Sequence, residues 1–125
     1  MADEHRAFEP RTDSVREARL FIREGVRVAG GDADAAELMT SELAANAVLH
    51  AQTRYEVRLR HTSTAIRVEV VNDRPEMIAK LVSASGESGR GLGIVNEMAS
   101  AWGVESGETQ KIIWFELPRH GASSS

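Results

Sequence analysis

The chain has 125 residues, which suits one domain, and its formal net charge at pH 7 is −4. This negative balance argues against a general nucleic-acid-binding protein, because such proteins usually carry a basic face. The absence of cysteine excludes disulfides and thiolate zinc sites. No apolar run approaches the ~20 residues of a membrane span, and the polar N-terminus lacks a signal-peptide core. We therefore expect a cytoplasmic protein with no membrane partner.

The first half of the chain predicts two helices that follow a loose end at residues 1–7. Apolar residues at helical spacing predict the first helix over residues 13–29. The pair Gly30-Gly31 ends it, and an aspartate at position 32 or 34 can cap a second helix that runs to about Ala51.

The second half predicts two strand pairs with a helix between them. Alternating apolar residues predict a hairpin that turns at residues 61–64. The remaining elements follow in order: strands at 55–60 and 66–70, a polar connection at 73–90 with a helical turn at 77–82, a helix at about 92–101, and strands at 102–106 and 111–117. This order predicts an α+β two-layer sandwich, in which three helices cover one face of a mainly antiparallel or mixed sheet. The domain is expected to span residues 8–118, with a second loose end at 119–125.

Polar residues interrupt the apolar face predicted for the second helix. At about 100° per residue, Glu42 and Asn46 fall in the middle of an otherwise apolar arc. The apolar members of that arc are Ala35, Leu38, Met39, Leu43, Ala45 and Leu49. A buried carboxylate is costly unless it is paired, hydrated or bound to a cation. Either Glu42 forms a cap or salt bridge in the core, or both residues face a polar pocket. In such a pocket Glu42 can act as a general base and Asn46 as an oxygen ligand for Mg²⁺.

A glycine-rich segment precedes the predicted third helix. Residues 86–93 have the sequence GESGRGLG. Glycines allow close approach of the backbone, and a helix N-terminus offers free N–H groups and a positive dipole end to anions. This combination predicts a phosphate cradle, although such segments also serve as simple turns. It is not a Walker A loop or a Rossmann fingerprint, because the Gly-Lys-Ser/Thr run and the directly preceding strand are missing.

Three segments, in this order, resemble the GHKL (Bergerat-fold) ATPases. Residues 41–51, SELAANAVLHA, resemble the N-box of that family, and residues 89–95, GRGLGIV, resemble its glycine-rich lid box. Residues 68–75, VEVVNDRP, stand where the family has its adenine-binding strand end. The resemblance covers about Phe8 to Leu117 and is strongest to stand-alone bacterial anti-sigma-factor serine kinases and related histidine-kinase-like ATP-binding regulators.

The resemblance implies a role for each matching residue. Glu42 would orient or deprotonate the attacking group, which is a water or a substrate serine. Asn46 would bind the Mg²⁺ ion that bridges the phosphates of ATP. Gly91 and Gly93 would give backbone contacts to the phosphates, and Arg90 would add positive charge there.

Asn72 stands where the family has an aspartate that accepts a hydrogen bond from the adenine amino group. An asparagine carbonyl can accept the same bond, but without charge assistance, which roughly halves its strength. Alternate residues from Ile66 to Asn72 share one face of the strand, so Asp73 points away unless a one-residue bulge brings it inward. The glycine that the family has shortly afterwards is replaced here by residues 74–76, RPE.

Three functions are compatible with these features. The first is an ATP- and Mg²⁺-dependent protein serine/threonine kinase of anti-sigma-factor type. It would bind a sigma factor, phosphorylate a serine of an antagonist protein, and pair with a second copy of itself as the resemblance implies. The second is a non-catalytic ATP-sensing or nucleotide-free protein-binding module, because Asn72 replaces an aspartate. The third is a structural α+β domain whose motifs are accidental.

Overall fold

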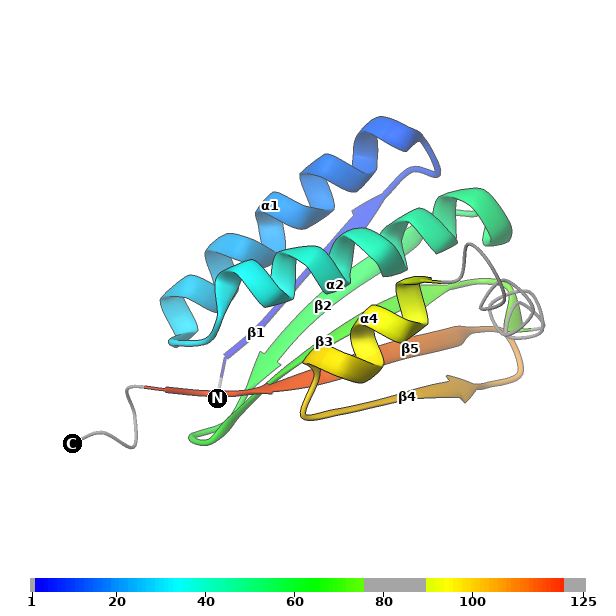
Figure 1. The fold of residues 1–125 in the computed structure, drawn as a ribbon. Coiled ribbons are helices and arrows are strands. Elements are labelled where there is room, and N and C mark those ends of the chain that lie inside the picture. Colours follow the sequence, from blue (N-terminus) through cyan, green and yellow to red (C-terminus); the bar gives the residue numbers. More distant parts are fainter. Residues whose placement is uncertain (1, 76–89, 121–125) are drawn as a thin grey trace.

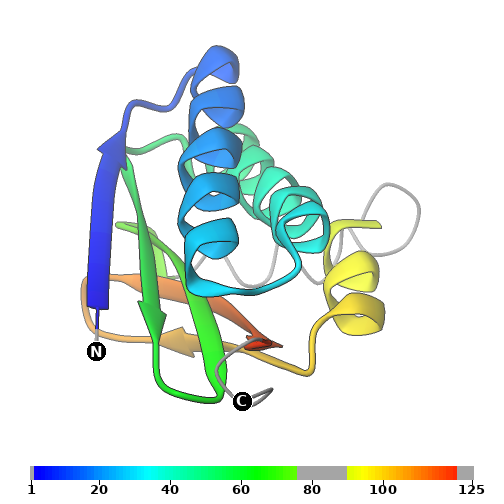
Figure 2. The same ribbon diagram turned by 90° about the vertical axis from the view of Figure 1, so that its left-hand side faces the viewer.

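The computed structural model describes residues 2–75 and 90–120, which form one antiparallel sheet with helices on one face (Figures 1 and 2). The sheet has five strands in the order β1-β2-β3-β5-β4. The strands are β1 Ala2–Phe8, β2 Tyr55–His61, β3 Ala65–Asn72, β4 Ala101–Ser106 and β5 Lys111–Pro118. The helices are α1 Thr12–Ala29, α2 Ala33–Asn46, which continues into the π-helical turn η1 Ala47–Ala51, and α4 Arg90–Met98. The predicted α+β sandwich with three helices on one face is therefore confirmed.

The helices begin and end close to the predicted positions. Gly30 ends α1 in the left-handed conformation, with φ of 90°. The side chain of Asp32 caps α2 by accepting a hydrogen bond from the Ala35 N–H at 3.1 Å. The third helix, α4, starts two residues before the expected position 92 and ends at Met98, and the expected helical turn at 77–82 lies outside the described residues. No described helix is both long and apolar enough to cross a membrane.

The N-terminal segment is an edge strand, which corrects the loose end expected at residues 1–7. β1 pairs with β2 over its whole length, from Ala2 opposite His61 to Phe8 opposite Tyr55. Residues 3–7 are exposed, so this strand lacks the alternation of buried apolar residues on which the sequence-based expectation depends. Polar, charged side chains are common on edge strands, where they discourage pairing with other chains.

The first two residues of the expected C-terminal loose end are also held by the fold. Arg119 donates hydrogen bonds to the backbone oxygens of Ala29 at 2.6 Å and Thr62 at 2.7 Å. The backbone N–H of His120 donates to the oxygen of Gly30 at 2.7 Å. These bonds attach the end of β5 to the end of α1, and residues 121–125 lie outside the described chain.

The core lies between the helices and the inner face of the sheet. Every strand pair is antiparallel and continuous in register, so alternate side chains of each strand face the helices. Those side chains are buried together with one face of each helix. Representative members are Ile22, Leu43, Val57, Val68, Val95 and Phe115.

Tyr55 connects β2 to β1 and α1. Its ring stacks on that of Phe8 with 5.5 Å between the ring centroids. Its hydroxyl lies 2.6 Å from the Oγ of Ser14 in a buried hydrogen bond. Burial raises the pKa of the Tyr55 phenol; the hydrogen bond between Tyr55 and Ser14 lowers it, and the charge of Glu17 raises it.

The only tyrosine of the chain should therefore resist ionisation in the folded protein. Its folded pKa lies above the unfolded value of about 10, so the stability from the neutral phenol is complete below about pH 10 and is lost as pH rises through the folded pKa. We expect ultraviolet difference absorbance of the phenolate to show a midpoint above pH 10 in the native protein and near 10 in denaturant. Ser14→Ala should raise the native midpoint further, and a native midpoint at or below 10 would contradict the packing.

Candidate functional site

Glu42 and Asn46 lie on the flank of α2 that is turned away from α1. The opposite flank is marked by ion pairs of Glu37 with Arg19 at 3.3 Å and Arg23 at 2.7 Å, both from α1. Glu37 and Asn46 are nine positions apart, which at about 100° per residue puts them on opposite sides of the helix. α1 and α4 flank α2 on its two sides (Figure 2), and α4 packs against α2. Glu42 and Asn46, one turn apart, therefore face α4.

The buried face of α2 lies further round the helix than the apolar arc predicted from the sequence. Leu38 is 43% exposed and Leu49 is 60% exposed, although both were expected on the apolar side. The buried face is formed mainly by smaller residues, which allow the helix to approach the sheet and α1 closely. Its members are Ala35, Ala36, Met39, Thr40, Leu43, Ala44 and Ala47. Glu42 and Asn46 consequently lie at the border of this face and are half-buried, not in its middle.

This border position decides between the two interpretations of Glu42. A half-buried carboxylate keeps part of its hydration, so its burial is less costly than that of a core charge. Glu42 takes no part in the ion pairs between α1 and α2 within the described chain. Among the residues that the structure describes, Glu42 therefore lies at the edge of the buried face, on the side of α4, and pairs with no charge of α1.

Two glycines of the lid-box motif, Gly91 and Gly93, lie in the first turn of α4. Arg90 is the first residue of the helix, and Gly91 and Gly93 follow within it, so this part of the motif is helical. The first four N–H groups of a helix have no partner within it. Gly93 is exposed, and a Cβ atom added there would meet no atom within 4 Å. N–H groups that lack a partner within the helix and open space around Gly93 thus coincide at this turn.

The N-terminal turn of α4 lies on the same side of the molecule as the Glu42/Asn46 flank. In Figure 1, α4 runs antiparallel to α2 and begins beside its C-terminal half. Five of the six predicted site residues, Glu42, Asn46, Arg90, Gly91 and Gly93, thus belong to two helices that pack against each other.

Asn72, the sixth predicted residue, is the last residue of β3 and is 1% exposed. It pairs with Tyr55 on β2 and with Lys111 on β5 in an unbroken register, so β3 contains no bulge. Asp73 is exposed, which excludes the alternative in which it turns inward. The Oδ1 of Asn72 accepts a hydrogen bond of 2.8 Å from the backbone N–H of Arg74.

Lys111 is a buried residue beside Asn72, and it was not predicted from the sequence as a member of the site. It is 0% exposed, lies opposite Asn72, and its Nζ donates a hydrogen bond to the Oγ of Ser106 on β4. Strand parity was the available signal, because Lys111 shares a face with Ile113 and Phe115, both buried. The inner face of the sheet therefore ends in a polar row, which consists of Tyr55, Asn72, Lys111 and Ser106.

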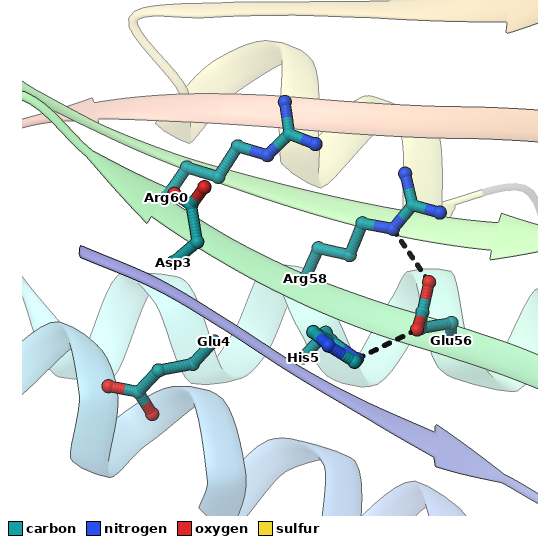
Figure 3. Close-up of a pocket in the computed structure, with 6 residues that line it drawn as sticks. All are labelled: Asp3, Glu4, His5, Glu56, Arg58 and Arg60. Carbon is teal, nitrogen blue, oxygen red and sulfur yellow. Dashed lines mark hydrogen bonds and ion pairs between the residues drawn. The ribbon is translucent and has the colours of Figure 1, made fainter. Parts of the chain in front are cut away.

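A cavity of about 330 Å³ lies at the outer face of the sheet, along β1 and β2 (Figure 3). Glu56 lies there between His5, whose Nδ1 is 2.9 Å from Oε2, and Arg58, whose Nε is 2.6 Å from Oε1. The lining charges are thus partly paired with one another, and the lining contains none of the six predicted site residues. We do not assign the nucleotide site to this cavity.

The residues beside α4 fit a magnesium ion only in combination with a phosphate ligand. Within residues 2–75 and 90–120, no group of three or more His, Asp or Glu side chains could hold a metal ion alone. Mg²⁺ is commonly bound by one or two protein oxygens together with substrate phosphates and water. The amide oxygen of Asn46 and the carboxylate of Glu42 are of this chemical type.

Comparisons with known proteins agree with this geometry. Residues 8–117 match the model of the histidine kinase-like ATPase domain. A search of curated proteins found no match. Among solved structures, the crystal structure of the RsbU and RsbW domains of Rv1364c from Mycobacterium tuberculosis is similar, with a TM-score of 0.68 and 18% sequence identity. The similarity covers 95% of this chain and 33% of that chain, so this chain spans about a third of that structure, and the likeness shows the fold alone.

The family match includes the second helix, the strand end at Asn72 and the first turn of α4, which are the three segments of the GHKL resemblance. Because the match covers most of the chain, the protein belongs to the histidine kinase-like ATPase domain family, and this membership implies that it binds ATP.

Proposed function

We propose that the protein is an ATP-binding regulator of the anti-sigma-factor kinase type. It binds a sigma factor and uses Mg-ATP to phosphorylate a serine of an antagonist protein. The observation that carries this proposal is the position of Glu42 and Asn46 on the flank of α2 that faces the first turn of α4. Membership of the histidine kinase-like ATPase domain family supports the binding of ATP. The resemblance to anti-sigma-factor serine kinases supports the proposal that the phosphate acceptor is a protein.

The first turn of α4 is the part of the site suited to phosphates. Its free N–H groups and the positive end of the helix dipole attract anions. Gly91 and Gly93 leave the backbone accessible, since neither carries a side chain, and space is open around Gly93. Arg90, at the start of the helix, would add positive charge.

Asn46 and Glu42 are suited to the metal ion and the acceptor. The amide oxygen of Asn46 would hold Mg²⁺ together with the nucleotide phosphates. When bound, the ion would supply positive charge to the transferring phosphoryl group. Glu42 lies one helical turn away, where its carboxylate would orient the serine hydroxyl and accept its proton. Asn72 would contact the purine base at the end of β3.

Exposed leucines beside Glu42 support a protein substrate. Leu38 and Leu49 project from the same side of α2 as Glu42, at helical spacing. Exposed apolar side chains close to a site are a common feature of surfaces that bind other proteins. We propose that the antagonist approaches along this side of α2. A second copy of the chain is a further proposed partner, which light scattering of the purified protein would detect as a doubled mass.

Incubation with Mg-ATP and the antagonist-type protein encoded beside it tests the kinase directly. We expect phosphoserine on the antagonist. Glu42→Gln should keep ATP binding but lower turnover by a factor on the order of 10²–10⁴, because it removes a general base. Asn46→Ala should lose magnesium-dependent binding of ATP.

Glu37→Gln is the matched control for these variants, since Glu37 lies on the opposite flank of α2 and should leave turnover unchanged. Confirmed ATP binding without any phosphoserine on the antagonist would refute the proposed kinase activity.

Gly93→Ala distinguishes an effect on phosphate binding from an effect on the stability of α4, because the two are expected to change in opposite directions. Alanine should raise the stability of α4 by about 0.5–1 kcal/mol, because glycine is a poor helix former and the added Cβ meets no protein atom within 4 Å. The same Cβ should weaken Mg-ATP binding, because it occupies the space that phosphate approaches. Thermal unfolding and calorimetry measure the two effects. Glu97→Ala, exposed on the same helix, should leave binding unchanged; unchanged binding in Gly93→Ala would place the phosphates elsewhere.

One observation favours a second function, a non-catalytic module that senses ATP or binds proteins without nucleotide. Asn72 is buried beside Lys111 at the end of β3, at the position where the resembled family has an aspartate. Thermal unfolding with Mg-ATP, with ADP and without ligand distinguishes a nucleotide-free protein, because a ligand at 100 times its Kd adds about 2.7 kcal/mol of stability. A nucleotide-free module would show no shift with either nucleotide.

A further inference from the structure

β1 forms one edge of the sheet, and its outer side is open. Within residues 2–75 and 90–120, β1 pairs with β2 alone. Figure 2 shows β1 at the side of the molecule, and α1 packs on β2 and β3. The strand continues for 7 residues without proline, and its register with β2 has no bulge. An exposed edge of this kind is a template on which another strand can pair.

The register of the sheet shows which backbone groups lie at the open edge of β1. In an antiparallel pair, alternate residues direct their N–H and C=O groups to the same neighbouring strand. At the hairpin between β2 and β3, the N–H of Thr62 donates to the oxygen of Ala65 at 2.9 Å, in the register of the two strands. Even-numbered residues of β2 therefore bond to β3, and odd-numbered ones bond to the even-numbered residues of β1. The N–H and C=O groups at the open edge thus belong to Asp3, His5 and Ala7.

Two side chains of opposite charge lie on the inner side of β1. Glu4 and Arg6 point to the same side of the strand, and Figure 3 shows Asp3 and Glu4 on opposite sides of it. The guanidinium of Arg6 lies 5.1 Å from the centroid of the Phe8 ring and 4.0 Å from the carboxylate of Glu17, and the Arg6 side chain is still 55% exposed. Glu4 is exposed and forms no ion pair with another described residue. Both charges are therefore accessible to a strand that pairs with the open edge.

A second copy of β1, antiparallel to the first and related to it by a two-fold axis at His5, fits this edge. His5 then lies opposite His5 of the second copy, and Asp3 lies opposite Ala7, so the open backbone groups of both copies pair with each other. The same register places Glu4 of each copy opposite Arg6 of the other. These two pairs are of the non-hydrogen-bonded kind, in which opposing side chains approach most closely.

The charges also select this register over its neighbours. Because only alternate residues have open backbone groups, the second strand can shift only in steps that preserve this alternation. The nearest two-fold registers place Glu4 opposite Glu4 or Arg6 opposite Arg6, and like charges directly opposite each other are destabilising. Charges on an edge strand discourage other partners, whereas this pattern is complementary to itself.

We propose that β1 joins two copies of this chain edge to edge into one continuous sheet, with the two-fold axis at His5. This inference deepens the proposed function, which includes a second copy of the chain, and rests on that part of it alone. It assigns the second copy to the open edge of β1 and leaves the helical face of each copy free for other partners.

Light scattering of charge-reversed variants tests the pairing of side chains. The wild type should have twice the mass of the chain. Glu4→Arg and Arg6→Glu each create two pairs of like charge, so each should weaken the dimer about tenfold. The double variant Glu4→Arg/Arg6→Glu restores opposite charges in both pairs and should recover the dimer. An equimolar mixture of the two single variants should form mixed dimers for the same reason.

Two further reversals are the matched controls for net charge. Glu108→Arg lies in the connection between β4 and β5, and Arg16→Glu lies on α1; both residues are exposed and distant in sequence from β1. Each should dimerise like the wild type. Loss of the dimer in these controls as well would overturn the pairing, because net charge alone would then explain the effect.

A proline at the axis tests the pairing of the backbone. His5→Pro removes an N–H at the open edge and leaves the bonds between β1 and β2 in place, so the protein should fold but lose most of its dimer. His5→Ala, which keeps the N–H, is the matched control and should dimerise like the wild type. Should a single charge reversal fail to fold, as judged by thermal unfolding, this comparison and the double variant test the same interface.

The outcomes separate this inference from the kinase activity. A monomeric wild type would overturn the edge pairing and the second copy together, while phosphorylation of the antagonist by the same sample would still support the kinase. A dimer that persists in Glu4→Arg, Arg6→Glu and His5→Pro would overturn the edge pairing alone, because the second copy would then bind elsewhere.

Discussion

The site depends on the unbroken antiparallel register of β2, β3 and β5, because only one face of the sheet is covered by helices. In such a sheet, each residue's position in the strand decides whether its side chain meets the core or solvent. A shift of one residue would place Asp73 inward and expose Asn72. The same alternation buries Lys111 and turns Ile112 outward, so the register determines which side chains stand beside Asn72 at the end of β3.

The outer face remains open because its charges are paired with one another. Glu69 is buried there, and its Oε2 lies 2.9 Å from the Nε of Arg67. The guanidinium of Arg67 in turn lies over the ring of Trp114, with 4.0 Å between its central carbon and the ring centroid. These contacts pair most of the charge around Glu69 without a second layer of helices, although Oε1 of Glu69 has no hydrogen-bond partner among the described residues.

Much of the fold follows from local sequence signals. Glycines and aspartates at helix ends and alternation in the hairpin are properties of neighbouring residues, and the structure agrees with both of them. β1 could not be predicted in this way, because an exposed edge strand is defined by its partner and not by its own pattern. The buried face of α2 was misplaced because hydrophobicity favours leucines, whereas close packing against α1 and the sheet selects alanines.

Lys111 escaped prediction for a related reason. A lysine at the start of a strand is usually solvated, and its burial depends on neighbours from β3 and β4 that only the three-dimensional pairing reveals. The six predicted site residues were found from motifs, but the structure was needed to show that the proposed phosphate end lies on α2 and α4 and the proposed base end lies at the end of β3. These two ends lie on different elements, and the helical layer holds them relative to each other.

Side-chain amide resonances of the three asparagines report on the central claim most directly. Asn46 lies at the proposed magnesium position and Asn72 at the proposed base position, whereas the Oδ1 of Asn96, further along α4, accepts a hydrogen bond of 3.0 Å from the Trp102 indole. On addition of Mg-nucleotide, binding between α2 and α4 predicts that the amide signals of Asn46 and Asn72 shift together while that of Asn96 stays close to its original position. Shifts confined to residues around Glu56 on the outer face, with Asn46 and Asn72 unchanged, would contradict it.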